Sequence, residues 1–460
     1  MNNEQDIKHE TPIQNFYAGQ SIFITGCTGF LGQILIEKLL RSCPDISTMY
    51  LLIRSKKDKS PESRLNEMFK SSVSIIFHLA ANVRFQEKIK SQIQTNICAT
   101  DTILRIAKLM PYLKSFIYVS TIYANFCVKH IEEHVYTYPI NYKDLITLTH
   151  ILSENTMEEK KAKITSQWPN TYTFTKAIAE GLLRDEGGDL PIGIFRPAII
   201  TSTANEPLVG WNNNFLGEIG LTVFISSGFQ RFMLCNPYIP ANFVPVDLTG
   251  NALIASAWDV FIQFRRGKDM LIYNFVPPAD APTIGEWFYK IADITKTYPL
   301  PKAQWRPFVI MLQRKMLYRI CIWLGHLLPA LLVDTISICM NYRPRMWKLY
   351  RKIHSRSYEM APFLTRRWSY SYDNVEAMWN RLNEQDQQLF KFYMKKFDWT
   401  NYFVNHYKGV RFFILNEDDS TLEISRIRDK RLYWIHQTFK TLFVFAIVWI
   451  IWIIFIKVFT

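Results

Sequence analysis

The sequence predicts an α/β fold with a doubly wound parallel sheet, followed by a helical C-terminal domain and a C-terminal transmembrane helix. Three observations support this prediction. Short, continuous apolar runs alternate with stretches of helical periodicity in the N-terminal half, as expected for parallel strands covered by helices on both faces. A glycine-rich turn follows the first of these runs. An uncharged apolar stretch, Thr441 to Ile456, lies close to the C-terminus.

The elements of the sheet follow one another in a regular order. The first strand enters the glycine-rich turn, and a helix with apolar residues at helical spacing leaves it. Strands are expected at Ser21–Thr25, Thr48–Ile53, Ile75–Ala80, Phe116–Ser120 and Ile192–Ile200, and helices at Phe30–Arg41 and Ile93–Met110. Strands that alternate with helices in this way build a doubly wound sheet. From Phe363 to Val410 the pattern is helical and rich in aromatic residues.

Composition narrows the range of partners. The chain has 460 residues and a formal net charge of +14, which suits nucleic acid, anionic lipid or a phosphorylated ligand. The sequence contains no nucleic-acid-binding motif, and the basic residues crowd near apolar segments, so lipid and phosphate are favoured. The seven cysteines are scattered and form no CxxC pair, which argues against a disulfide framework and against a zinc site. We therefore expect no bound metal.

The apolar C-terminal stretch is expected to act as a tail anchor. It is slightly shorter than the ~20 residues of a spanning helix, but Lys440 and Lys457 can snorkel. Four basic residues lie just upstream and place that side in the cytosol. They are Arg426, Arg428, Lys430 and Arg431. The alternative is a terminal helix buried against the protein.

A second apolar stretch, Ile320 to Val333, holds His326 and Pro329 and is only fourteen residues long. At that length we expect an interfacial or re-entrant element, or else a buried helix. A basic cluster follows it and could face anionic headgroups, or could simply be a solvated helix face. The cluster consists of Arg343, Arg345, Lys348, Arg351, Lys352 and Arg356.

The turn TGCTGFLG, Thr25 to Gly32, has the context of a dinucleotide-binding site, because it follows a strand and opens a helix. Gly26, Gly29 and Gly32 permit the tight turn, the close approach of pyrophosphate and the packing of the helix, whose N-terminus favours anions. The second strand ends in Arg54 rather than in Asp or Glu. A guanidinium there matches a 2′-phosphate, which favours NADPH over NADH.

Tyr172 and Lys176 lie four residues apart, so a helix would place both on one face. A nearby ammonium is expected to lower the pKa of the phenol, which would make Tyr172 a proton donor to a carbonyl. Thr121 follows the fourth strand and is expected to hold the substrate oxygen, with Ser120 as the alternative. His78 lies inside an apolar strand and is interpreted as structural.

Together these motifs resemble the extended short-chain dehydrogenase/reductase superfamily, whose domain is Rossmann-like, and more narrowly the fatty acyl-CoA reductases. The resemblance covers nearly the whole chain. Besides the glycine-rich turn, it is carried by HLAANVRF (78–85), YVSTIYAN (118–125), YTFTK (172–176), RPAII (196–200), FVPVD (243–247) and two C-terminal stretches (363–382 and 397–415). It implies that NADPH reduces a long-chain acyl-CoA thioester to a primary alcohol, through an aldehyde and with release of CoA. It also implies a membrane of the endoplasmic reticulum or, alternatively, of the peroxisome.

The resemblance also implies roles for single residues and a domain plan. Lys176 would bind the nicotinamide ribose, and Arg54 the 2′-phosphate. The residues assigned to the cofactor are Thr25, Gly26, Thr28, Gly29, Phe30, Leu31, Gly32, Arg54, Ala80, Ala81, Asn96, Tyr172 and Lys176. The expected parts are an N-terminal tail (1–18), the NADP-binding domain (19–290), a membrane-associated or linker segment (300–345), a helical domain (346–430) and the anchor (438–460). The sequence gives no indication of oligomeric state.

Two departures from the family pattern stand out. Members usually carry a helix, a further strand and a Gly-Asp turn between the second and third strands, whereas only Asp58 to Ser74 lies there in this chain. A Gly-Glu pair, Gly217-Glu218, replaces an expected Gly-Pro turn. Two alternatives therefore remain: a sterol or other lipid dehydrogenase of the same superfamily, and an inactive membrane-bound pseudo-reductase.

Overall fold

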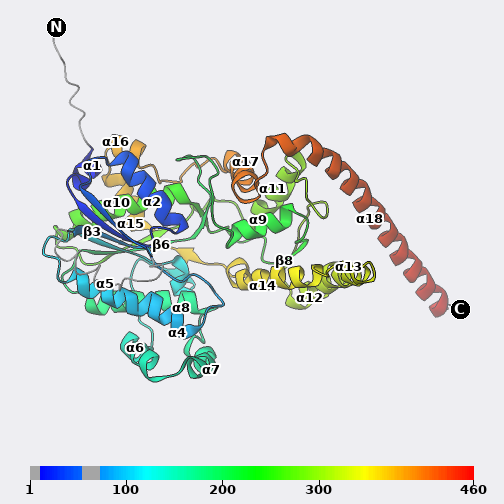
Figure 1. The fold of residues 1–460 in the computed structure, drawn as a ribbon, viewed down its shortest axis with the longest axis horizontal. Helices are drawn as coiled ribbons and strands as arrows, with labels where there is room; N and C mark the ends of the chain where they lie inside the picture. The colour runs from blue at the N-terminus through cyan, green and yellow to red at the C-terminus, as the bar shows by residue number, and fades with distance from the viewer. Residues whose placement is uncertain (1–10, 54–72, 460) are drawn as a thin grey trace, which may run out of the picture. The chain divides into compact units, whose positions relative to one another are not determined.

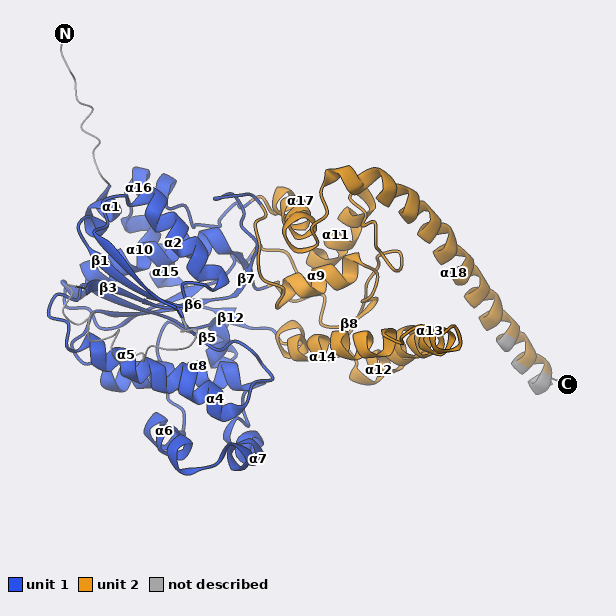
Figure 2. Cartoon of the chain, in the orientation of Figure 1, with its two compact units in different colours: residues 1–209, 242–279, 367–397 blue, residues 210–241, 280–366, 398–460 orange. Residues whose placement is uncertain are grey.

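The computed structural model describes residues 11–53 and 73–459 (Figure 1). The chain forms two compact units, shown in Figure 2. Unit 1 comprises residues 1–209, 242–279 and 367–397, and unit 2 comprises residues 210–241, 280–366 and 398–460. Each unit is assembled from three separate stretches of chain, whereas the domains expected from the sequence are continuous. Arg54 lies outside the described residues.

Unit 1 contains a six-stranded sheet in the order β10-β6-β4-β3-β1-β2, with every neighbouring pair parallel. Its strands are β1 (Ser21–Thr25), β2 (Thr48–Leu52), β3 (Val73–His78), β4 (Ser115–Val119), β6 (Ile192–Pro197) and β10 (Leu271–Phe275). The predicted doubly wound parallel sheet is confirmed. The chain runs from β1 to β2 on one side and to β3 on the other, so the strand order reverses next to β1. Ligands of such sheets bind at the carboxyl edge near this reversal.

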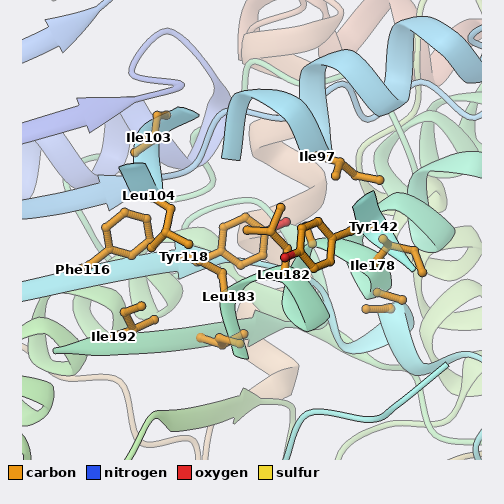
Figure 3. Packing of buried hydrophobic residues seen from close by; sticks show 14 of the residues in the cluster. Ile97, Ile103, Leu104, Phe116, Tyr118, Tyr142, Ile178, Leu182, Leu183 and Ile192 are labelled. Atoms are coloured by element: carbon orange, nitrogen blue, oxygen red, sulfur yellow. The ribbon is translucent and has the colours of Figure 1, made fainter. Parts of the chain in front are cut away.

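Helices cover both faces of this sheet (Figure 1). One face carries α4 (Ile89–Ile93), a π-helical turn η1 (Gln94–Cys98), α5 (Ala99–Ala107) and α8 (Thr171–Glu186). The other carries α1 (Pro12–Tyr17), α2 (Phe30–Ser42), α10 (Val246–Phe264), α15 (Asp373–Arg381) and α16 (Glu384–Leu389). Figure 3 shows the core under α5 and α8, where Leu104, Leu182 and Leu183 pack with Phe116 and Tyr118 of β4.

The shorter elements of unit 1 lie around the carboxyl edge and on its periphery. They are η2 (Ile122–Asn125), β5 (His130–Ile131), α6 (Tyr142–Ile151), α7 (Glu154–Ile164), β7 (Ile199–Thr201), β9 (Phe243–Pro245) and β12 (Ser369–Tyr370). The strand expected at Ile192–Ile200 is divided in two. Ala198 N–H bonds to Phe275 O, whereas β7 leaves the main sheet and pairs with β9. The redirected strand carries the chain away from the edge of the main sheet.

Unit 2 is mostly helical. Its elements are α9 (Glu218–Ser226), β8 (Phe232–Leu234), α11 (Ile284–Thr297), β11 (Ile310–Leu312), α12 (Lys315–Ile322), η3 (Trp323–Leu327), α13 (Leu328–Cys339), α14 (Met346–Thr365), α17 (Trp399–Gly409), η4 (Val410–Ile414), η5 (Asp419–Thr421) and α18 (Leu422–Phe459). Strands β8 and β11 pair in parallel.

The unusual Gly217-Glu218 pair has a structural explanation in unit 2. Gly217 adopts φ 66°, a left-handed conformation that favours glycine, and it precedes α9. Glu218 is buried, and its Oε1 accepts a hydrogen bond from Trp287 Nε1 at 2.9 Å and lies 3.3 Å from His406 Nε2. A buried carboxylate thus joins α9 to α11 and α17 at the position where the sequence analysis expected proline.

Two helices in the described part of the chain are long and apolar enough to cross a membrane. The first runs without interruption from Lys315 to Cys339, through α12, η3 and α13, so the expectation of a fourteen-residue element was too short. The π-helical turn keeps the chain helical up to Pro329, which stands in the first turn of α13. The second lies in α18, whose apolar side chains, such as Phe443 and Trp449, are exposed. The alternative of a buried C-terminal helix is therefore not what the structure shows.

Candidate active site

The glycine-rich turn joins β1 to α2, and the local packing requires two of its glycines. Gly26 has φ +74°, and a Cβ there would lie 2.7 Å from the backbone nitrogen of Ala80. A Cβ on Gly32 would lie 2.3 Å from Gly26 O. Gly29 is the N-cap of α2 and has no side chain, so no N-cap side chain fills the space before the first turn of the helix, a place that favours an anion. This cradle fits the pyrophosphate of a dinucleotide.

A buried hydrogen-bond chain holds the turn against β3. Thr25 Oγ1 accepts from Ala80 N–H at 3.1 Å and bonds to His78 Nδ1 at 2.7 Å, and His78 Nε2 bonds to Thr100 Oγ1 at 3.0 Å. Burial lowers the pKa of His78 to about 3, so the imidazole is neutral. These contacts agree with the structural role expected for His78. They also place Thr25 in the support of the turn.

Asn96 fixes the loop that follows β3. It lies in the π-helical turn η1 and is buried. Its Oδ1 accepts from Asn82 N–H at 2.8 Å, and its Nδ2 donates to Thr175 Oγ1 of α8 at 2.9 Å. The half-buried residues Ala80 and Ala81 open this loop. Asn96 therefore ties the loop expected to line the cofactor to the helix that carries Tyr172 and Lys176.

The remaining residues assigned to the cofactor differ in exposure. Thr28 and Gly29 are exposed at the tip of the turn, and Phe30 is half-buried. Leu31 is buried in the first turn of α2. Thr28 and Gly29 are therefore open to a ligand, while Leu31 anchors the helix.

Helix α8 presents Tyr172 and Lys176 on one face, as their spacing predicts. Asn170 caps the helix by accepting from Thr173 N–H at 2.9 Å. Lys176 is buried, donates to Val119 O at the end of β4 at 2.6 Å, and lies 4.4 Å from the centroid of the Tyr118 ring. Burial lowers the pKa of Lys176 to about 7.

The expected effect of Lys176 on Tyr172 is wrong in this arrangement. Burial raises the pKa of Tyr172 instead of lowering it. The Tyr172 ring stacks on Phe85 with centroids 6.2 Å apart, and the Lys176 amine is directed to the β4 carbonyl. Spacing on a helix places two side chains on one face, but the bonds that they make depend on neighbouring strands, which the sequence pattern does not reveal.

Ser120 and Thr121 follow β4 and differ in their hydrogen bonds. Ser120 Oγ donates to the buried carboxylate of Glu180 at 2.5 Å. Thr121 Oγ1 accepts from Tyr123 N–H at 3.4 Å, which leaves the Thr121 hydroxyl proton available to an acceptor. Both side chains are almost fully buried at the carboxyl edge of the sheet.

Glu180 and Arg196 form a buried ion pair that holds the Ser120 hydroxyl. The sequence analysis did not identify this pair. Arg196 donates to Glu180 through Nε at 2.9 Å and through Nη2 at 2.6 Å. Glu180 lies one turn after Lys176, so the spacing Tyr-x-x-x-Lys-x-x-x-Glu could have placed it on the same helix face. Arg196 belongs to RPAII, which the sequence pattern singled out without assigning a function to its arginine.

Comparisons with known proteins identify the family. Two family models, both described as male sterility protein, match the chain: an NAD-binding model at residues 24–74 and 67–253, and a second model at residues 325–417. The chain is 34% identical to "Fatty acyl-CoA reductase wat" of Drosophila melanogaster and 32% identical to "Fatty acyl-CoA reductase 1" of Homo sapiens. Each alignment covers 96% of this chain and 93% of the relative. The chain belongs to the fatty acyl-CoA reductase family.

Solved structures agree on the fold of this fatty acyl-CoA reductase family member. The terminal R domain of the myxalamid biosynthetic pathway matches 87% of the chain with a TM-score of 0.51 and 17% identity, covering 92% of that structure. A UDP-glucuronic acid 4-epimerase from Bacillus cereus in complex with NAD has a TM-score of 0.50 and 11% identity, covering 87% and 99%. The family and the fold establish a nicotinamide-dependent oxidoreductase.

The match to the NAD-binding family model is divided into two ranges, which overlap at residues 67–74. This overlap falls within Asp58 to Ser74, the connection that the sequence analysis expects to be shorter than the family pattern. Among the described residues, β2 forms the edge of the sheet and is only half-buried, whereas β1 is buried throughout. The family match thus continues on both sides of this connection.

Proposed function

We propose that this chain uses NADPH to reduce a long-chain fatty acyl-CoA to the primary alcohol through the aldehyde, with release of CoA. One observation carries the proposal. The glycine cradle after β1 and the hydroxyl, phenol and amine groups after β4 and on α8 lie at the carboxyl edge of one parallel sheet. Strands β1 and β4 are separated by β3 alone, so their ends are roughly 10 Å apart. That spacing suits a dinucleotide whose pyrophosphate lies at the cradle and whose nicotinamide end reaches the groups near β4.

The cofactor, when bound, supplies hydride from the nicotinamide, and the residues of the chain bind and orient it. The cradle of Gly26, Gly29 and Gly32 would take the pyrophosphate at the N-terminus of α2. Lys176 would donate to the nicotinamide ribose. Arg54 would pair with the 2′-phosphate, and this guanidinium in place of a carboxylate is the reason to propose NADPH rather than NADH.

Thr121 and Tyr172 would act on the carbonyl oxygen. Thr121 has a hydroxyl proton to donate, while the Ser120 proton is held by Glu180, so we favour Thr121 as the group that polarises the carbonyl. Burial raises the pKa of Tyr172, so the phenol remains protonated at neutral pH and can deliver its proton as negative charge develops on the oxygen. The first reduction breaks the thioester and frees CoA and aldehyde, and the second gives the alcohol.

The site is proposed to work at a membrane surface. The apolar part of α18 is exposed and long enough to span a bilayer, and basic residues precede it. We infer a tail anchor with the catalytic unit in the cytosol. The endoplasmic reticulum is the proposed membrane, with the peroxisome as the alternative. A long-chain acyl-CoA also partitions at such surfaces.

A test uses the full chain in detergent or proteoliposomes with NADPH and palmitoyl-CoA. The expected products are free CoA and hexadecanol, with two NADPH oxidised for each alcohol formed. The Tyr172→Phe variant should lose this activity while keeping the thermal stability of the parent. The absence of both aldehyde and alcohol from the parent, at the level of Tyr172→Phe, would contradict the proposal.

A second candidate, an inactive membrane-bound pseudo-reductase, is favoured by the division of the family match into two ranges that overlap at residues 67–74. Titration of the full chain with NADPH, followed by nucleotide fluorescence, separates the two. Saturable binding that weakens in Gly32→Ala supports the reductase. Binding that is absent at every NADPH concentration supports the pseudo-reductase.

A further inference from the structure

The first apolar helix of unit 2 is half of a helical hairpin, here called the α12–α14 hairpin (residues 315–365). The helix from Lys315 to Cys339 ends in a turn at Asn341, which has φ 60°. The chain then returns as α14. Asp334 closes the hairpin, because its carboxylate accepts from the backbone N–H groups of Arg345, Met346 and Trp347 at 2.8–2.9 Å. The two helices are thus fixed to each other at the turn.

One narrow stripe of the first helix is buried within unit 2. Its members recur every fourth residue: Tyr318, Ile322, His326, Ala330 and Asp334. Ala330 packs with Tyr350 and Ile353 of α14, and the rings of His326 and His354 stack with centroids 5.1 Å apart. Only 28% of the most apolar part of this helix is buried. The hairpin contact therefore uses a small part of the helix surface.

Most of the remaining surface is apolar and exposed, with Lys315, Arg319 and Thr335 as polar exceptions. Large exposed side chains follow each other along the whole helix: Met316, Leu317, Ile320, Trp323, Leu324, Leu328, Leu331, Leu332, Val333, Ile336 and Ile338. A continuous apolar surface of this length is unusual on a soluble protein and marks an interaction site.

The returning helix, α14, exposes a cluster of basic side chains. Lys348, Arg351, Lys352 and Arg356 of α14 are exposed, and so are Arg343 and Arg345, which directly precede the helix. Arg356 pairs with Glu359 at 2.9 Å. An apolar helix joined to a basic helix matches the two chemical layers of an anionic membrane surface.

We propose that the α12–α14 hairpin lies in the plane of an anionic bilayer surface. The exposed side chains of α12 and α13 enter the acyl boundary, and the Arg and Lys side chains of α14 contact the headgroups. This lipid contact is separate from the C-terminal anchor and does not depend on the proposed catalytic function.

Packing within the hairpin favours the in-plane arrangement over a spanning one. If the helix from Lys315 to Cys339 crossed the bilayer, α14 would have to follow it, because Asp334 and the buried stripe hold the two together. The basic side chains of α14 would then lie in the hydrocarbon, where Arg and Lys are strongly disfavoured. An in-plane hairpin keeps the same contacts and leaves every basic side chain within reach of headgroups.

The test measures how deeply one labelled residue of the full chain lies in the bilayer of proteoliposomes. Leu332→Cys is labelled with a fluorescent maleimide, and the unsubstituted chain, labelled in the same way, gives the background of the native cysteines. Nitroxide lipids that quench at shallow or at deep positions report where the label lies. We expect strong shallow quenching in vesicles with phosphatidylserine and weak quenching in vesicles of phosphatidylcholine alone.

Charge reversal supplies the matched comparison, because C-terminal anchoring is unchanged in both variants. The triple variant Lys348→Glu, Arg351→Glu and Lys352→Glu should lose most shallow quenching. Each basic residue near an anionic surface contributes a factor of about five, so loss of the three positive charges alone should lower the ratio of docked to undocked hairpin roughly 100-fold. The control variant Arg265→Glu, Arg266→Glu and Lys268→Glu changes charge equally on exposed residues of unit 1 and should behave as the parent.

Three outcomes would overturn the proposal. Deep quenching that is insensitive to the α14 charges would indicate a spanning helix. No quenching in any vesicle would indicate that protein, such as a second copy of this chain, covers the apolar face. Equal losses in the two triple variants would indicate a general charge effect. None of these readouts involves NADPH or turnover, so they remain informative if the proposed function fails.

Discussion

Two adjacent hydroxyls at the end of β4 should contribute very differently to the reaction. Ser120 donates its proton to Glu180 at 2.5 Å, and Glu180 is held in turn by both guanidinium bonds of Arg196. Thr121 uses its oxygen as an acceptor from Tyr123 N–H and keeps its proton for another acceptor. We therefore expect Thr121→Val to impair turnover and Ser120→Ala to impair mainly stability.

The structure sets the size of each effect. Removal of one donor to a developing oxyanion typically lowers kcat by about 10²–10³-fold, which is the range expected for Thr121→Val. Ser120→Ala removes one hydrogen bond to a carboxylate, a loss of about 1.5–3 kcal/mol in the free energy of unfolding. Glu180 keeps its two bonds from Arg196 in that variant, so the buried charge stays paired. We expect kcat to change less than about tenfold.

The assay measures NADPH oxidation by the full chain with saturating palmitoyl-CoA, together with the melting temperature of each variant. Thr121→Ser is the matched control, because it keeps a hydroxyl at the position and should retain most of the activity. Loss of turnover in Ser120→Ala equal to that in Thr121→Val, at an unchanged melting temperature, would refute the reasoning. Ser120 would then be the group that binds the substrate oxygen.

Three further variants probe the turn, the buried amine and the hairpin. Gly32→Ala should weaken NADPH binding more than tenfold in a fluorescence titration, because its Cβ would lie 2.3 Å from Gly26 O. The control Gly181→Ala has open space around its Cβ. It should bind NADPH normally and raise the free energy of unfolding by about 0.5–1 kcal/mol. Lys176→Met should have a higher melting temperature than the parent below pH 7, and this difference should shrink from pH 7 to 10. The pKa of Lys176 is about 7 in the folded state and higher in the unfolded state, so the parent gains stability as the pH rises through this window. The variant has no amine at this position and does not gain it. A difference that grows with pH would contradict this. Asp334→Ala should lower the free energy of unfolding by about 1–2 kcal/mol and speed hydrogen exchange in the first turn of α14. Unchanged exchange there would show that this cap does not stabilise the helix.

The sheet was predictable from the sequence because its strands are buried on both faces. The residues of β1, β3 and β4 are buried almost without exception, and a continuous apolar run is the expected signature of such a strand. The glycine-rich turn was equally predictable from the sequence, because backbone atoms close to Gly26 and Gly32 exclude a side chain at both positions. Local chemistry fixed these elements.

Features that depend on distant segments could not be predicted in the same way. The apolar run at Ile192–Ile200 reads as one strand, but it divides where Ala198 meets β10, some 75 residues later. The fourteen apolar residues at Ile320–Val333 proved to be the middle of a longer helix, because the flanking turns are helical although they are less apolar. Apolar periodicity reports burial, whereas the end of an element depends on which distant segments it meets.

The largest gap between sequence and structure concerns the partner of Lys176. Helical spacing pairs Lys176 with Tyr172, and it would equally pair Lys176 with Glu180, one turn further on. In the structure Glu180 raises the pKa of Lys176 and so opposes the effect of burial, while it also holds Ser120 and Arg196. The pKa of Lys176 near 7 therefore reflects burial, which lowers it, and the Glu180 carboxylate, which raises it. This balance rests on residues from α8, β4 and β6, so the motif alone selects the proposed reacting groups but does not determine their protonation states.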